Sequence, residues 1–492
     1  MLRRSFLLAA VLAAACNGSV EPTSAPAAET TDAGSMTKPS PDAGTDGDAP
    51  LRDVTEMKTV DLGTVSAGQT VTLDVPAGAL GFVAIVQGAN EGDPVGVEAI
   101  TSPSGEVVHT AYTPKGGSHA TSQSSFGAIA AAAVPQSEAK SATPPESGKW
   151  TIELGDGAGG TTTTMHAEAR IQMGSATGFV GGRLDLNVYV PDGLDLGGSR
   201  LDASKAQASE EIARRLDVFF ESLFDLYAVD RGKVTFVPAA ADLKQITTDT
   251  QLLDAFAASA GRKDEQALNV VLTNAIDFGG GNAAWGIAPG IPGAATRAGT
   301  VMSGIVLAVG DTPAIGDGLT LLHEAGHFFG LNHTTELEGG LADPLGDTPK
   351  CEGISLSDPS TLGKCPDKKN IMFPTFYGTA GALVQASDAQ RSVVHGSPVI
   401  RAYADGVLGQ GNRARRSWGA RLSLTKSGRD LDPTEAYLAA TLCPHTKSDP
   451  RAFVAARGRK AIDELRAAAS DPDLPSVVRR KAAGILSALG EP

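Results

Sequence analysis

The chain has 492 residues, of which 41% are hydrophobic, 20% are charged and only 5% are aromatic. This length permits about two to four domains with ample hydrophobic core. The formal net charge of −15 argues against non-specific nucleic-acid binding, because that activity needs a basic surface.

Residues 1–16 are predicted to form an export signal of the bacterial lipoprotein type. Two arginines form the charged start, a short apolar stretch follows, and small residues lead to Cys16. Cleavage before Cys16 would leave a lipidated residue that holds the protein on the cell envelope. The alternative is an ordinary secretory signal, cut nearby, which would release the protein. The apolar stretch is too short for a lasting transmembrane helix, so we expect membrane contact only through this lipid.

Residues 17–53 are rich in Ser, Thr, Pro, Ala, Gly and Asp and poor in large apolar residues. Such a segment cannot bury enough surface to offset the entropy cost of ordering it. We therefore expect a disordered tether between the signal and the folded part.

Residues 54–175 are predicted to form a β-sandwich accessory domain. Short runs rich in β-formers, bounded by Gly and Pro, lie at 71–75, 82–86 and 148–154. The histidines of this region lack the mutual spacing of metal ligands, so we interpret them as surface or packing residues. They are His109, His119 and His166.

Residues 180–400 alternate between strand and helix patterns. Strands are predicted at 184–190, 234–237 and 268–272, and a helix at 203–227 has apolar residues at helical spacing. These elements predict a mixed, twisted sheet covered by helices.

The segment His323 to His333 has the pattern HExxHxxGxxH. On a helix, His323 and His327 lie one turn apart on the same face and can present two imidazoles to one ion. Gly330 can adopt positive φ, so the helix can stop there and the chain can return with His333. Glu324 is placed beside the first ligand rather than on the metal.

Three protein ligands leave a fourth position open, which is typical of a catalytic zinc ion rather than a structural one. Zinc lowers the pKa of a bound water to about 7, and Glu324 is placed to take its proton as that water attacks a carbonyl. The short HExxH pattern alone also occurs on surface helices, but the added glycine and third histidine favour a metal site.

This motif resembles the zinc signature of the metzincin peptidases. A methionine turn lies beneath the zinc in that family, and Met372 in Asn-Ile-Met-Phe-Pro matches it. The resemblance implies a zinc metalloendopeptidase with a protein or peptide substrate and an active-site helix under a mixed sheet.

The Asp-Thr-Pro element at 347–349, with cysteines around it, resembles the pappalysin branch of the metzincins. That branch has a tyrosine two residues after the turn methionine, where this chain has Pro374, and Tyr377 is out of register. Pro374 keeps an alternative open, in which the chain is a weakly catalytic or non-catalytic surface binding protein on a metzincin scaffold.

Cys351 and Cys365 are close in sequence, and in an exported protein we expect them to form a disulfide. The bond would close a loop of about fifteen residues and stabilise the fold by ~3 kcal/mol. Asp343, Asp347 and Asp367 are candidate calcium ligands in this region. The alternative is that these carboxylates are solvated or cap turns.

A glycine-rich run at 279–293 precedes an apolar strand predicted at 303–309. The resemblance implies that this run forms a cleft rim next to an edge strand. An extended peptide could pair with that edge through backbone hydrogen bonds.

Residues 401–492 are predicted to be helical, since three Asp-Pro pairs there look like helix starts. The whole chain is therefore predicted to be a multidomain α+β protein, with an N-terminal β-sandwich, a metzincin-like catalytic domain and a helical C-terminal region.

Overall fold

The computed structural model describes a set of residues that includes most of the chain between 52 and 404. They are residues 52–111, 124–126, 128–155, 163–279, 283–310, 314–336, 342–351, 364–374, 384–404, 459–470 and 486. The predicted export signal with Cys16, nearly all of the predicted tether, and most of the predicted helical region lie outside these residues. One helix of that region is described, α11 (Arg459–Ser470). Among the described residues, no helix is both long enough and apolar enough to cross a bilayer.

Two antiparallel sheets form the N-terminal part, which we call the N-terminal sheet pair (residues 58–173). The five-stranded sheet has the order β1-β9-β3-β7-β6 and the four-stranded sheet the order β2-β8-β4-β5. The strands of the first are β1 (Lys58–Ser66), β9 (Thr164–Met173), β3 (Ala79–Gly88), β7 (Ile129–Val134) and β6 (Ser124–Phe126). The strands of the second are β2 (Thr70–Val75), β8 (Gly148–Gly155), β4 (Gly96–Thr101) and β5 (Val107–Thr110).

One hydrophobic core lies between the two sheets. Strand β2 alternates exposed and buried residues along its length, as expected for a strand with one face in water. The ring of Phe82 on β3 meets Trp150 on β8 edge-on, with 5.3 Å between centroids. Strands β3, β7 and β9, in contrast, are buried on both faces over most of their length, because their outer face packs against the remainder of the molecule.

A six-stranded mixed sheet forms the centre of the second part, in the order β13-β10-β15-β19-β18, with β20 also paired to β10. Four neighbouring strands are parallel, and β18 pairs antiparallel with β19 at one edge. The strands are β13 (Val229–Ala239), β10 (Gly182–Pro191), β15 (Leu268–Thr273), β19 (Gly304–Ala308), β18 (Gly286–Ile287) and β20 (Arg401–Ala402). The mixed sheet predicted from the sequence is therefore present.

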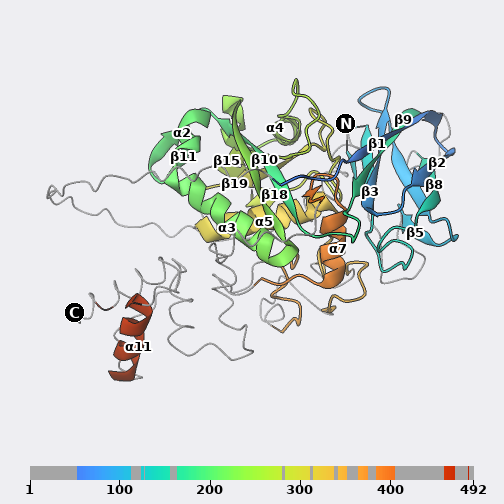
Figure 1. The fold of residues 1–492 in the computed structure, drawn as a ribbon. Helices are drawn as coiled ribbons and strands as arrows, with labels where there is room; N and C mark the ends of the chain where they lie inside the picture. Colours follow the sequence, from blue (N-terminus) through green and yellow to red (C-terminus); the bar gives the residue numbers. More distant parts are fainter. Residues whose placement is uncertain are drawn as a thin grey trace.

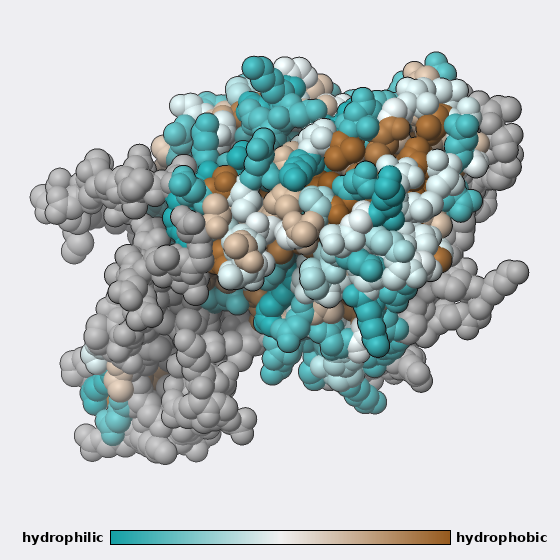
Figure 2. Space-filling model, turned by 45° about the vertical axis from the view of Figure 1, so that its right-hand side comes forward, coloured by the Kyte–Doolittle hydropathy of each residue, from teal (hydrophilic) through white to brown (hydrophobic). Residues whose placement is uncertain are grey.

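Helices cover both faces of this sheet (Figure 1). Helices α3 (Glu210–Tyr227) and α5 (Ala314–Phe329) share a core with one face, and α4 (Asp249–Phe256) shares a core with the other. Helix α7 (Asp388–Gly396) packs against strand β3 of the N-terminal sheet pair. In Figure 2, hydrophobic residues reach the surface in a band on the upper right, and hydrophilic residues are spread over the rest of the described surface.

The prediction of a single helix at 203–227 is wrong, because this segment forms two helices. The structure has α2 (Ala203–Gln207), a break, and then α3. Ser209 has extended backbone and its hydroxyl accepts from the Ile212 N–H, so it caps the start of α3. Serine at this position satisfies a helix-terminal N–H that otherwise has no partner, which favours a new helix start over continuation.

Candidate metal centre

Helix α5 carries two histidines and a glutamate into the interior. It is buried along nearly its whole length from Asp317 to Phe329. Two glycines let neighbouring segments approach its backbone. A Cβ atom on Gly318 would lie 2.7 Å from Val218 on α3, and one on Gly326 would lie 2.5 Å from the sulfur of Met372. The buried ion pair between Arg215 of α3 and Asp317, with 2.6 Å between Nε and Oδ2, fixes the crossing of the two helices.

Gly330 ends the helix in the way that the sequence predicts. Its φ is +117°, a conformation that glycine adopts without steric cost. The Leu331 N–H donates to the Gly326 carbonyl at 2.9 Å, and the Gly330 N–H donates to the His327 carbonyl at 3.0 Å. These two bonds define a Schellman cap, which reverses the chain. The reversal brings His333 back to the two helical histidines.

The three imidazoles converge on one point. The Nε2 atoms of His323 and His327 are 3.1 Å apart, those of His323 and His333 are 3.1 Å apart, and those of His327 and His333 are 3.2 Å apart. All three side chains are at most 2% exposed.

The hydrogen bonds of the three Nδ1 atoms determine whether each Nε2 atom can bind a metal. The Nδ1 atoms of His323 and His327 lie 2.7 and 2.8 Å from the carbonyl oxygens of Ile371 and Leu331. The Nδ1 atom of His333 lies 3.0 Å from Glu336 Oε2. Because those oxygens only accept, each Nδ1 must carry the proton, and each Nε2 presents a lone pair.

Three lone pairs facing one another at these distances repel unless a cation lies between them. Nitrogen ligands at about 2.0–2.1 Å from a tetrahedral zinc ion stand about 3.3 Å apart, close to the spacings seen here. The donor set and its outer hydrogen bonds therefore fit zinc.

Burial sets the electrostatics of the cluster. It lowers the pKa of His323 to about 3, with the neighbouring His333 adding to the effect, and it lowers the pKa of His327 well below its usual value. The rings of His323 and His327 are therefore neutral near pH 7, which is the form that binds a metal. Burial also raises the pKa of Glu324 to about 8, against the opposing effect of a hydrogen bond from the Ala288 backbone.

The carboxyl group of Glu324 is held close to edge strand β18. The Ala288 N–H donates to it, while Oε1 is buried and has no hydrogen-bond partner among the described residues. A Cβ atom on Gly286 would lie 2.6 Å from Glu324 Cγ and 2.9 Å from Thr320 Cγ2. Glycine at 286 is therefore what allows the strand to lie against the glutamate.

The methionine turn lies directly beneath the histidines. Met372 is fully buried, and its carbonyl accepts from the Thr334 N–H at 3.1 Å, one residue after His333. The neighbouring Ile371 carbonyl holds His323. Pro374 belongs to the same turn, whereas Tyr377 lies outside the described residues.

The predicted disulfide is present, with 2.06 Å between the sulfurs of Cys351 and Cys365. The three candidate calcium ligands differ in their hydrogen bonding. Asp347 accepts from the Ala389 N–H at the start of α7. Asp343 and Asp367 are buried, and each has one carboxylate oxygen without a hydrogen-bond partner among the described residues. Burial raises the pKa of Asp343 to about 7.

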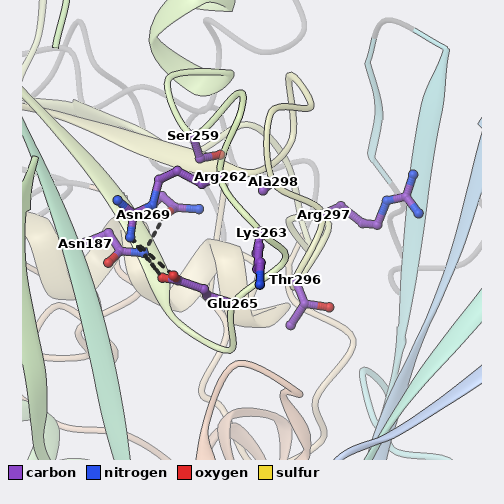
Figure 3. Close-up of a pocket in the computed structure, with 9 residues that line it drawn as sticks. All are labelled: Asn187, Ser259, Arg262, Lys263, Glu265, Asn269, Thr296, Arg297 and Ala298. Carbon is purple, nitrogen blue, oxygen red and sulfur yellow. Dashed lines mark hydrogen bonds and ion pairs between the residues drawn. The ribbon is translucent and has the colours of Figure 1, made fainter.

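A small polar pocket lies elsewhere, among the loop after α4, the sheet and the segment around Arg297 (Figure 3). Its cavity volume of about 10 Å³ has room for about one water molecule. None of the histidine cluster lines it, so we do not interpret it as a substrate site.

Comparison with known proteins gives a family match over part of the chain. Residues 230–376 match the family model Reprolysin_5, described as metallo-peptidase family M12. No curated protein matches the chain. Among solved structures, archaemetzincin from Methanopyrus kandleri is 19% identical over 44% of this chain and 88% of its own, with a TM-score of 0.22. Metalloproteinase-II from Bacteroides fragilis is 12% identical over 37% of this chain and 59% of its own, also with a TM-score of 0.22.

The matched segment contains all three histidines, Glu324 and Met372. Its family implies zinc and a protein or peptide substrate, and the histidine cluster supplies a suitable donor set. Residues 230–376 are therefore similar to a zinc-dependent peptidase domain.

Sequence reasoning did not find every residue of this centre. Glu336 lies three positions after His333, and an acidic residue so close to a ligand is a signal that could have identified it. Gly286 and Ala288 lie in the glycine-rich run that the sequence predicts to be a cleft rim, but the sequence does not indicate that they contact Glu324.

Proposed function

We propose that the chain is an exported metzincin-type zinc endopeptidase. The observation that carries this proposal is the convergence of three imidazoles whose outer nitrogens all lie within hydrogen-bonding distance of acceptors. His323, His327 and His333 would hold the ion. When bound, zinc would polarise the scissile carbonyl and make a water molecule acidic enough to lose a proton near neutral pH.

Glu324 would be the general base. A proton acceptor in a closed site needs an oxygen that no other donor occupies, and Glu324 Oε1 meets this condition. The hydrogen bond from Ala288 would hold the other side of the carboxyl group in a fixed orientation. Opposite charge on the neighbouring ion would favour the ionised carboxylate, against the effect of burial.

An extended peptide would add to the side of β18 that does not pair with β19. This strand is the edge of the mixed sheet, and Ala288 directly follows it. Backbone pairing at that edge would place a peptide bond beside Glu324 while demanding little of the peptide's side chains. The substrate class is therefore an unfolded or extended segment of a protein.

The test uses the processed chain, loaded with zinc and incubated with a denatured protein and a peptide library. We expect cleavage that stops on chelation and on Glu324→Gln, while Glu324→Gln still binds one zinc ion. Glu265→Gln, at an exposed ion pair with Arg262, is the matched control and should cleave normally. Equal cleavage by Glu324→Gln would contradict the role of Glu324.

A binding protein on the same scaffold is the second candidate, and Pro374 is the observation that favours it, since no tyrosine follows the methionine at that position. Zinc-loaded wild type that cleaves nothing in broad libraries would support this candidate. The pappalysin branch remains a prediction from the Asp-Thr-Pro element, beside a match to family M12.

Two further parts of the proposal concern location and calcium. Lipidation at Cys16 would place the enzyme on the cell envelope, which mass spectrometry of the mature N-terminus would test. Asp343 and Asp367 are the proposed calcium ligands, because each has a buried oxygen without a partner among the described residues. Calcium should then raise the melting temperature of wild type more than that of Asp343→Asn.

A further inference from the structure

We propose that Gln136, two residues beyond β7, is a positioning residue for the metal centre. The N-terminal sheet pair would then act on the site, through this side chain, rather than serve as a separate accessory part. The inference rests on the metal centre proposed above.

Gln136 reaches the point where helix α5 ends. Its side chain is buried, and its Nε2 donates to the Gly330 carbonyl at 3.1 Å, with the Ile291 carbonyl at 3.5 Å. The carbonyls at a helix end have no partner within the helix, and a buried one without a donor costs about 1–3 kcal/mol. Gln136 supplies that donor from another part of the fold.

The peptide that Gln136 holds is part of the zinc cluster's support. The carbonyl of Gly330 and the N–H of Leu331 belong to the same planar peptide unit. That N–H closes the Schellman cap on Gly326, and the Leu331 carbonyl accepts from His327 Nδ1 at 2.8 Å. A change in the plane of this peptide would therefore turn the carbonyl that orients His327 and move the segment that leads to His333.

Gln136 can fix that plane only if the sheet pair itself is fixed. A buried charge network provides this. Glu168 on β9 lies 2.9 Å from Arg170 and 2.8 Å from Arg297, the latter in the segment that follows the glycine-rich run. Arg170 Nε also donates to Thr296 Oγ1 at 2.8 Å. Figure 3 shows Arg297 pointing away from the other pocket residues, toward the strands of the sheet pair.

Close packing supports the same contact. Val83, Ile85 and Ala131 of the sheet pair share a buried cluster with Ala294 and Met302. Two residues before Val83 on the same strand, a Cβ atom on Gly81 would lie 2.5 Å from the Cα atom of Gly396 on α7. The two backbones therefore touch, and the sheet pair has little freedom to slide relative to α5.

The first experiment compares two variants of the full processed chain. Gln136→Leu replaces the amide by an apolar side chain and removes the donor to Gly330. Thr273→Val is the matched control, because it removes the hydrogen bond from the buried Thr273 Oγ1 to the Lys244 carbonyl at 2.8 Å, which belongs neither to the helix end nor to the contact with the sheet pair. Zinc affinity is measured by competition with a chromophoric chelator, and the absorption spectrum of the cobalt-loaded protein reports the ligand geometry.

We expect Gln136→Leu to weaken zinc binding by about tenfold, as removal of supporting hydrogen bonds does at other metal sites, and to alter the cobalt spectrum. Thr273→Val should lower the melting temperature while leaving zinc affinity and the cobalt spectrum unchanged. Equal zinc affinity in wild type and Gln136→Leu would overturn the inference. Absence of stoichiometric zinc in wild type would instead overturn the proposed function.

A second measurement needs no variant. Coupling between two sites is reciprocal, so zinc binding to wild type should slow amide hydrogen exchange at residues 136–138. Strands β2 and β8, on the far sheet, should show no change. Equal exchange rates at residues 136–138 with and without zinc, in protein shown to bind zinc, would also overturn the inference.

Discussion

The Nδ1 atom of His333 lies 3.0 Å from Glu336 Oε2, whereas the outer nitrogens of the other two histidines meet backbone carbonyls. A carboxylate acceptor draws the ring proton more strongly than a carbonyl does, and so makes the inner nitrogen a better metal ligand. His333 lies beyond the end of helix α5, so the helix backbone does not hold its ring. The contact with Glu336 orients the ring instead.

Replacing Glu336 should therefore weaken the metal centre. We expect Glu336→Gln to raise the zinc dissociation constant by about 10-fold, because the amide can keep the geometry but not the charge. Chelator competition measures the change, and Glu265→Gln provides a surface control. An unchanged zinc dissociation constant would show that the contact with Glu336 does not help His333 to bind zinc.

The closeness of Gly286 to Glu324 gives a second prediction. In Gly286→Ala the new methyl group would lie 2.6 Å from Glu324 Cγ, so either the strand or the base must move. A misplacement of about 1 Å costs on the order of 100-fold in rate, and we expect a loss of about 10–100-fold in kcat with zinc still bound. Gly92→Ala is the control, since nothing lies within 4 Å of a Cβ atom there.

The buried His109 predicts how stability depends on pH. Burial lowers the pKa of His109 to about 4, from a usual value of 6.5. Between these values the unfolded chain binds a proton that the folded chain does not, so the free energy of unfolding falls as the pH falls. The full slope for one such group is about 1.4 kcal/mol per pH unit.

We therefore expect His109→Met to reduce the slope of stability against pH between about 6.5 and 4. Urea unfolding at several pH values measures the slope, which is independent of any loss of absolute stability in the variant. His166→Gln is the control, since the ring of His166 remains 43% exposed. A variant with the wild-type slope would show that His109 is not the group responsible.

The disulfide gives a prediction on stability. Cys351 and Cys365 are 14 residues apart, and the loop they close should contribute ~3 kcal/mol through the unfolded state. The double variant Cys351→Ser/Cys365→Ser should be less stable by about this amount in urea unfolding. Reduced wild type should match the variant; a further loss in the variant would point to packing of the cysteines against Phe373.

Much of the fold follows from local patterns that the sequence displays. Alternation along β2 and apolar runs in β10 and β15 predict their strands, because one face or both faces of each must be buried. The zinc motif predicts the helix, its end at Gly330 and the return of His333, since each step depends on residues within eleven positions of one another.

Contacts between distant segments could not be predicted in this way. Gln136 is a polar residue after an alanine-rich strand, and only the docking of that strand against α5 gives its amide a partner. The double burial of β3 and β9 likewise depends on a surface more than a hundred residues away. The helix break at Ser209 depends on local sequence only. However, residue types alone do not show whether the capping hydrogen bond of Ser209 is more favourable than one continuous helix.

The segment just before β1 lies beside β20 and the residues that follow it. The Thr55 N–H donates to the Ala402 carbonyl at 2.8 Å, and the Ala404 N–H donates to the Asp53 carbonyl at 3.0 Å. A short linker from 404 back to 53 would thus give a circular permutant with new termini in a surface turn. It also follows that this contact cannot form during synthesis until residue 402 has been made, 347 residues after residue 55.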